Sequence, residues 1–264
     1  RIFFNLNNFL IDLIQLYEKN GFEVQSSLSP LHFPGFDHAY LPFSYIYLNG
    51  KLMCKGGGLA ISELMFVDCV TSIINPQNIF IIGNSFGWTT LALGLMCPAS
   101  RVVAIDMCPR PDEAYGIEVT NKLGRQIKAE ILAVKAKSPD NVLEVVKNNF
   151  NDGIDLVLID GGHTPEQQMA DFKACQALAN KKCIYLFHDV INFQMVDSFV
   201  EIAKQNDYLL SSILFRTPTG MAISYPKEYY DRLASTVHAF TESDQRVKKL
   251  HSEGRKKIVS SQSG

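Results

Sequence analysis

The stretch "IFIIGNSFGWTT", residues 79–90, governs how the rest of the chain is interpreted. An apolar run is followed by Gly83, and Gly87 lies four positions later with Ser85 between the two glycines. This G-x-S-x-G spacing is typical of the nucleophile elbow of hydrolases. It equally fits a glycine-containing loop that joins a buried strand to a helix and brings backbone N–H groups against a nucleotide cofactor. The sequence on either side of the loop distinguishes these two interpretations.

The length and composition limit the possible classes of protein. The chain has 264 residues, which suffice for one large α/β domain with appendages or for two small domains, and its 47% hydrophobic content supports a sizeable core. It carries 25 basic and 27 acidic residues, a net charge of −2, so we expect no nucleic-acid partner. No apolar stretch reaches the roughly 18 residues that a membrane span needs. Six cysteines without a C-x-x-C pair indicate buried, reduced thiols of a cytoplasmic protein rather than disulfides or zinc ligands.

The alternation of apolar runs with helical segments predicts the fold class. Apolar runs that lack polar alternation and are separated by helices are typical of a parallel sheet covered on both faces. The stretch "YLLSSILFRTPTGMAISYP", residues 208–226, adds two strands joined by a turn, which we expect as an antiparallel hairpin at the sheet edge. We therefore predict a doubly wound seven-stranded α/β sheet with its last strand pair antiparallel. The apolar runs lie at 79–82, 102–105, 131–134, 156–159 and 183–187.

Composition shifts divide the chain into three regions. Residues 1–58 combine an N-terminal amphipathic helix with an irregular aromatic stretch over 25–58, which we expect to form a lid or cap. Residues 59–226 form the core that contains the predicted sheet. Residues 227–264 are predicted to begin as a helix and to end in a polar, basic tail.

Two helix starts are marked by a capping residue followed by proline. Ser138 precedes Pro139, and Thr164 precedes Pro165, so we expect each polar residue to be the N-cap of a helix. Gln167 stands at the capping-box position of the second of these helices.

The position of Asp106 favours a cofactor-binding loop over a hydrolase elbow. Ligands of an open parallel sheet bind beyond the carboxyl ends of its strands. Asp106 ends the second apolar run and lies 23 positions after Gly83 (106 − 83 = 23), where nucleotide-binding folds have a carboxylate for the ribose hydroxyls. A hydrolase elbow has no use for this carboxylate, and little of the sequence before residue 79 indicates sheet. A serine hydrolase that uses Ser85, with Asp160 or Asp189 and a later histidine, remains the alternative.

Five motifs in order carry a family resemblance: "IIGNSFGWTT", "VVAIDM", "LVLIDGGHTPEQQMADF", "YLFHDV" and "TPTGMAISYP". Over roughly residues 60–226 the chain resembles the class I S-adenosylmethionine-dependent methyltransferases, in particular small-molecule O-methyltransferases whose fourth strand ends in D-G-x-H and whose fifth ends in H-D. The resemblance implies a Rossmann-like methyltransferase fold, S-adenosylmethionine as cofactor and methyl transfer to an oxygen of a small-molecule acceptor. It implies a cofactor site formed by Gly83, Asn84, Ser85, Phe86, Gly87, Trp88, Thr89, Asp106, Met107, Ser138, Asp160 and Gly161.

The strand ends also suggest the catalytic residues. Asp160 and Asp189 follow neighbouring buried strands, so we expect both carboxylates to open into one crevice. Together they can hold one Mg²⁺, which orients an acceptor oxygen and lowers its pKa. His188 or His163 can take the acceptor's proton, since histidine titrates near neutral pH. The alternative is that His163 only bonds to its loop and that His188 is a packed side chain at the strand end.

Three points stay open at this level. Many members of the family carry an acid two residues before the first glycine to hold the methionine ammonium, and this chain has Ile81 there. The ammonium is then held by loop carbonyls or by another acid, or the chain is a non-catalytic nucleotide-binding or scaffold protein on the same fold. Trp88 either borders the adenine or lies in the core under the first helix. The oligomeric state is undetermined, and a homodimer is one option.

Overall fold

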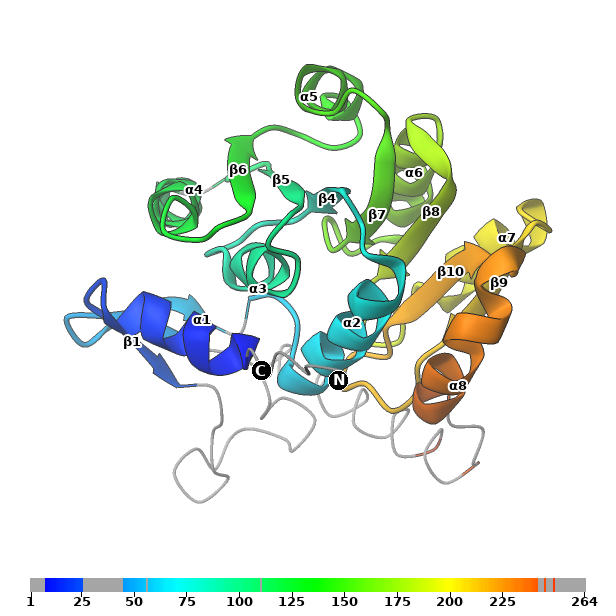
Figure 1. The fold of residues 1–264 in the computed structure, drawn as a ribbon, viewed down its shortest axis with the longest axis horizontal. Coiled ribbons are helices and arrows are strands. Elements are labelled where there is room, and N and C mark those ends of the chain that lie inside the picture. The colour runs from blue at the N-terminus through cyan, green and yellow to red at the C-terminus, as the bar shows by residue number, and fades with distance from the viewer. Residues whose placement is uncertain are drawn as a thin grey trace, which may run out of the picture.

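The computed structural model describes most of the chain and contains one large mixed sheet (Figure 1). The strand order of this seven-stranded sheet is β6-β5-β4-β7-β8-β10-β9. Strands β4 to β8 are parallel, and β10 is antiparallel to both of its neighbours. The predicted doubly wound sheet is therefore confirmed, and its strand order reverses at β4 and β7. The described residues are 8–25, 45–55, 57–109 and 111–241, with Gln245 and Lys249.

Each of the five apolar runs lies inside one strand of the sheet, because each run supplies the side chains that the sheet buries. The strands are β4 (Asn78–Ile82), β5 (Arg101–Asp106), β6 (Glu130–Lys135), β7 (Ile154–Ile159), β8 (Ala179–Phe187), β9 (Leu209–Ile213) and β10 (Ala222–Pro226).

Helices cover both faces of this sheet (Figure 1). Successive strand residues point to opposite faces, so Ile79 and Ile81 join one hydrophobic core while Phe80 and Ile82 join the other. The first core is closed by α2 (Ile61–Ile74), α3 (Trp88–Met96), α4 (Pro111–Gly124) and α8 (Tyr230–Phe240), which follows the short helix η2 (Lys227–Tyr229). The second is closed by α5 (Val142–Asn149), α6 (Pro165–Gln176) and α7 (Val196–Gln205).

The N-terminal region adds a helix and a small sheet beside α3. Helix α1 (Phe9–Glu18) packs against α3, and the phenol of Tyr17 donates a hydrogen bond of 2.8 Å to the carbonyl oxygen of Phe86. A three-stranded antiparallel sheet follows, in the order β1-β2-β3. The N-terminal region therefore touches the loop after β4 directly. Its strands are β1 (Phe22–Gln25), β2 (Tyr45–Leu48) and β3 (Lys51–Lys55).

The expectation of an irregular chain over residues 25–58 is wrong for residues 45–55, which form the β2–β3 hairpin. Asn49 and Gly50 make its two-residue turn with φ values of 51° and 74°. Asn-Gly between two short apolar runs is the strongest local signal for such a hairpin, because both turn positions need a positive φ. The remaining aromatic stretch, and with it most of the predicted lid, lies outside the described residues.

The predicted helix start at Ser138-Pro139 is also wrong. Helix α5 begins at Val142 with Asn141 as its N-cap, and residues 139–141 form a turn. The hydroxyl of Ser138 donates to Asp171 Oδ1, and the three residues after it form a turn rather than the first turn of α5. The second predicted start is confirmed, because Thr164 caps α6 by accepting a hydrogen bond of 3.1 Å from the backbone of Gln167.

All six cysteines are free thiols, and only Cys69 is exposed. Among the helices of the described residues, none has both the length and the apolar character that crossing a bilayer requires.

Candidate active site

The glycine loop, residues 83–87, joins β4 to α3 at the carboxyl edge of the sheet. Gly83, Ser85 and Gly87 have positive φ values of 100°, 47° and 85°. A Cβ atom at Gly83 would lie only 2.0 Å from the backbone oxygen of Asp160, so no larger residue fits there. The loop after β4 and the loop after β7 are therefore in direct contact, and a ligand on one reaches the other.

Asp106 holds the glycine loop in place. Its Oδ2 accepts hydrogen bonds from the backbone N–H groups of Asn84 (3.0 Å) and Ser85 (2.8 Å). Its Oδ1 accepts one from the N–H of Cys108 (2.9 Å). A carboxylate offers about four acceptor positions, so roughly one remains on Oδ1 of this partly buried side chain. Asp106, which is predicted to bind the ribose, therefore also fixes the conformation of the glycine loop.

Five side chains, Glu63, Asp160, His163, His188 and Asp189, form a histidine–carboxylate cluster beside the loop. His188 lies in its interior and is only 4% exposed. Its Nδ1 lies 2.9 Å from Asp160 Oδ1, and its Nε2 lies 3.0 Å from Glu63 Oε2. A ring with a carboxylate oxygen at each nitrogen donates from both, which makes it an imidazolium ion. Burial lowers the pKa of His188, but Asp160, Asp189 and Glu63 together raise it well above its usual value.

His163 is the accessible histidine of the cluster, with 36% of its side chain exposed. Its Nε2 lies 3.2 Å from Asp189 Oδ2 and 3.9 Å from Asp160 Oδ1. The ring stacks on Phe193, with the centroids 4.2 Å apart and the planes inclined by 14°. Burial lowers the pKa of His163, but its bonds to Asp160 and Asp189 outweigh this and raise the pKa to about 9.

The two aspartates stay ionised in spite of their burial. Burial raises the pKa of Asp160 and of Asp189, but the positive charge of His188 outweighs it and keeps both pKa values below the usual range. Asp189 has a positive φ of 57°, and its Oδ1 accepts a hydrogen bond of 3.0 Å from the amide of Asn192. The two carboxylates therefore lie close together, as predicted, and the positive charges of two histidines lie beside them.

Glu63 is a member of the cluster that sequence reasoning missed. It lies on α2 and is completely buried. Its Oε2 accepts from the N–H of Ala60 (2.8 Å) as well as from His188, and its Oε1 accepts from the N–H (3.2 Å) and the hydroxyl of Thr219. The available signal was a single acid inside the apolar stretch "ISELMFV", one helical turn before the buried Val67.

Asp160, His163 and Asp189 also have the donor atoms of a metal site. In the described part of the chain they are a group whose ligand atoms all lie within 4.8 Å of one another. Carboxylate oxygens suit Mg²⁺ and Mn²⁺, and an imidazole nitrogen suits Zn²⁺ or Fe²⁺. Because His163 would have to lose its proton to bind, the three residues fit a divalent ion only with a neutral imidazole.

The other predicted cofactor residues differ in their accessibility. Met107 directly follows Asp106 and is 51% exposed. Phe86 and Thr89 are buried, and the hydroxyl of Thr89 accepts a hydrogen bond of 2.9 Å from the N–H of Leu59. Trp88 lies in the core, where its indole N–H donates to the oxygen of Leu59 at 3.1 Å. We therefore treat Trp88 as a packing residue, while Met107 remains free to contact a ligand.

Ser85 lacks the partners of a catalytic serine. Its hydroxyl lies 3.6 Å from the thiol of Cys54. Of the histidines that the structure describes (163, 188 and 238), none contacts it, whereas a nucleophilic serine needs a base within hydrogen-bonding reach. Nothing in this surrounding supports the hydrolase alternative.

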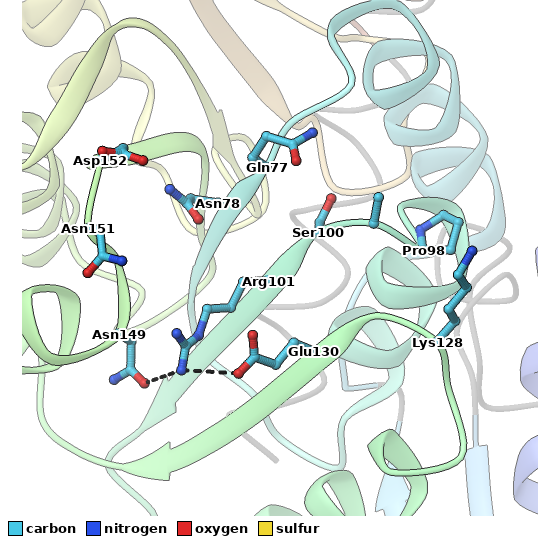
Figure 2. A pocket seen from close by; sticks show the side chains of 11 residues that line it. Gln77, Asn78, Pro98, Ser100, Arg101, Lys128, Glu130, Asn149, Asn151 and Asp152 are labelled. Atoms are coloured by element: carbon cyan, nitrogen blue, oxygen red, sulfur yellow. Dashed lines mark hydrogen bonds and ion pairs between the residues drawn. The ribbon is translucent and has the colours of Figure 1, made fainter.

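A cavity of about 360 Å³ lies at the opposite edge of the sheet, near the starts of β4, β5 and β6 (Figure 2). Figure 2 shows the Arg101 side chain between those of Asn149 and Glu130, which it contacts at 3.4 Å and 3.3 Å. Parallel sheets bind their ligands beyond the carboxyl ends of the strands, and the cluster described above lies at that edge. We therefore do not assign the reaction to this cavity.

Comparisons with known proteins agree with this geometry. Residues 80–190 match a family model described as a methyltransferase domain. The O-methyltransferase from Bacillus cereus, solved in complex with SAH, superposes with a TM-score of 0.56 at 11% identity and covers 85% of this chain and 93% of its own. The O-methyltransferase TomG from Streptomyces achromogenes, involved in tomaymycin synthesis and solved with SAM, superposes with a TM-score of 0.55 at 12% identity. The match covers 85% of this chain and 92% of that protein. No curated protein matches the chain significantly. The fold resemblance expected from the motifs is confirmed.

Proposed function

We propose that this chain, which carries a methyltransferase domain on the class I fold, transfers a methyl group from S-adenosylmethionine to an oxygen of a small-molecule acceptor. One observation carries the proposal: the glycine loop held by Asp106 adjoins the histidine–carboxylate cluster, with Gly83 against the backbone of Asp160. The residues proposed to bind the cofactor and those proposed to remove the proton therefore adjoin one another. Two structures of the same fold were solved with SAH and SAM, which supports the choice of cofactor.

The residues after β4 and β5 fit the nucleoside part of the cofactor. The remaining acceptor position of Asp106 suits a ribose hydroxyl, and the exposed side chain of Met107 suits the flat face of the base. S-adenosylmethionine, when bound, supplies an electrophilic methyl carbon on a sulfonium ion. The chain itself has to align the acceptor oxygen with that carbon and to keep water out.

The cluster can replace the acid that Ile81 does not provide. Ile81 is completely buried in β4 and offers no charge. In the cluster, three carboxylates are matched by two imidazolium rings, which leaves one negative charge at the crevice. This charge favours a cation nearby, either the methionine ammonium or a divalent ion.

His163 is the proton acceptor in this proposal, and His188 is not. Both nitrogens of His188 are bonded to carboxylates, so it cannot take a proton and instead orients Asp160 through Nδ1. Nε2 of His163 lies nearer the surface beside Asp189. Because its pKa is about 9, His163 holds a proton at neutral pH and must lose it before it acts as a base. An ion held by Asp160 and Asp189 would add positive charge beside the ring and lower that pKa.

The requirement for a divalent ion is tested by turnover. With labelled S-adenosylmethionine and a panel of phenols, aliphatic alcohols and amines, we expect methyl transfer to hydroxyl acceptors. EDTA should lower this turnover at least about ten-fold, and added Mg²⁺ or Mn²⁺ should restore it, since an ion next to the acceptor oxygen lowers its pKa. Full activity in EDTA would leave His163 and Asp189 to act without a metal. Transfer to the amines alone would contradict the proposed acceptor.

The cofactor assignment is tested at Asp106. Asp106→Ala should weaken the binding of S-adenosylhomocysteine at least ten-fold, because it removes a charge-assisted hydrogen bond of about 1.5–3 kcal/mol and releases the glycine loop. Isothermal titration calorimetry measures the change. Asp152→Ala removes an exposed acid near the opposite edge of the sheet and should leave the affinity unchanged. Equal dissociation constants for Asp106→Ala and the unaltered protein would refute the ribose assignment.

A further inference from the structure

Asp171 on α6 is a buried acid that the proposed reaction does not use. The residue is completely buried, and its Oδ2 has no hydrogen-bond partner in the part of the chain that the structure describes. Burial raises the pKa of Asp171 above its usual value, although bonds from Ser138 and Gln167 oppose the shift. A buried carboxyl group with an unpaired oxygen is costly, so its retention calls for a physical reason.

The other oxygen of Asp171 organises the loop after β6. Its Oδ1 accepts a hydrogen bond of 2.7 Å from Nε2 of Gln167, and this nitrogen also donates to the backbone oxygen of Ser138 at 3.0 Å. The hydroxyl of Ser138 donates to the same Oδ1. Both bonds therefore end on one acceptor atom, and the single hydroxyl hydrogen of Ser138 is committed to it.

A hydroxyl group in this state can only accept hydrogen bonds from a ligand, because its two lone pairs are all that remains. Ser138 is partly buried and follows β6, whose end pairs with the end of β5 at Lys135 and Asp106. Ser138 therefore lies beyond the carboxyl end of β6, next to the strand end that carries Asp106 and on the side away from the glycine loop after β4. An adenine bound beside it would offer its 6-amino group as a donor, whereas its N1 is an acceptor and could not pair with Ser138.

We propose that Asp171 is a positioning residue that holds the Ser138 hydroxyl as an acceptor, so that the site selects purines with a 6-amino group. This inference rests on the proposed function, since it concerns the same cofactor site. Asp171 can act on two strand ends at once, because a Cβ atom at Gly161 would lie 3.3 Å from its Oδ2. It joins α6 to the loop after β6 and borders the loop after β7.

The test compares S-adenosylhomocysteine with its analogue in which hydrogen replaces the 6-amino group, by isothermal titration calorimetry. The unaltered protein should bind the analogue about ten-fold more weakly, the value of one hydrogen bond. Ser138→Ala and Asp171→Leu should reduce this ratio to below about three-fold, because the acceptor is lost or free to rotate. Asp171→Asn should keep the ratio, since its amide oxygen still accepts from Ser138. Asp140→Ala is the matched control, because it removes an exposed acid from the same loop.

Each outcome decides a different point. Equal binding of both compounds by the unaltered protein would overturn the role of Ser138 but leave the proposed function intact. A ten-fold ratio in Asp171→Leu would show that Ser138 does not depend on Asp171. If Asp171→Leu does not fold, Asp171→Asn decides, because loss of the ratio there would overturn the inference. Failure of the unaltered protein to bind S-adenosylhomocysteine at all would refute the proposed function and, with it, this inference.

Discussion

Asp189→Asn is expected to lower turnover at least about 100-fold while weakening the binding of S-adenosylhomocysteine by at most about ten-fold, since the cluster loses one negative charge. Oδ2 of Asp189 lies 3.2 Å from Nε2 of His163 and 3.3 Å from Nδ1 of His188. An asparagine keeps the size of the side chain but removes the charge that both rings face. General-base catalysis contributes about 10²–10⁴ in rate, and this change disables the group that orients the base. Turnover and calorimetry on the same preparation separate chemistry from binding.

The control for this change is Asn192→Ala. It removes the hydrogen bond of 3.0 Å to Asp189 Oδ1 and leaves the charge in place. We expect a loss of turnover of only a few-fold, because one neutral hydrogen bond contributes about 1 kcal/mol. Full activity of Asp189→Asn would mean that the end of β8 is structural and that the catalytic assignment is wrong.

Glu63→Gln is expected to lower the free energy of unfolding by about 3–5 kcal/mol, the usual cost of removing one partner of a buried ion pair. Both carboxylate oxygens of Glu63 accept two hydrogen bonds, from Ala60 and His188 on one side and from Thr219 on the other. A glutamine must turn its NH₂ group toward one of these pairs of donors. It also leaves His188 with one carboxylate fewer. Urea denaturation followed by circular dichroism measures the loss.

Thr219→Val provides the comparison for Glu63→Gln. It removes the hydroxyl donor to Glu63 Oε1 but leaves the backbone N–H of residue 219 and the ion pair with His188 intact. The expected cost is about 1 kcal/mol. If Glu63→Gln cost no more than Thr219→Val, the bond between Glu63 and His188 would contribute nothing as an ion pair.

The fold, the glycine loop and the positions of Asp106, Asp160 and Asp189 were predictable, because they depend on local patterns and on the order of the strands. Apolar runs of four or five residues mark strands that are buried on both faces, and glycines at 83 and 87 mark a loop with positive φ. The spacing from Gly83 to Asp106 follows from the length of one helix between two parallel strands. Asp160 and Asp189 were expected to meet for the same topological reason, and their side chains do share His188 and His163.

The contacts that complete the site were not predictable, because they join residues far apart in the chain. Glu63 and His188 are 125 positions apart, and Glu63 and Thr219 are 156 apart. No local period distinguishes an acid that meets a histidine in the core from one that faces solvent. Ser138 was misread for a related reason: a serine before proline is a good cap in isolation, but α5 begins only at Val142, and the hydroxyl of Ser138 bonds to Asp171, 33 positions later.

The hydrogen bonds of Glu63 also determine which parts of the structure unfold together in local fluctuations. The β9–β10 hairpin lies at the sheet edge, and hairpins at an edge commonly exchange their amide hydrogens through local fluctuations. Here the turn at Thr219 is fastened to α2 and, through Glu63, to the end of β8. Detaching the turn would leave a buried carboxylate without two of its donors, so the hairpin, α2 and the crevice should open as one cooperative unit. Slow amide exchange at Thr219, at the rate of the innermost strands, would be its signature.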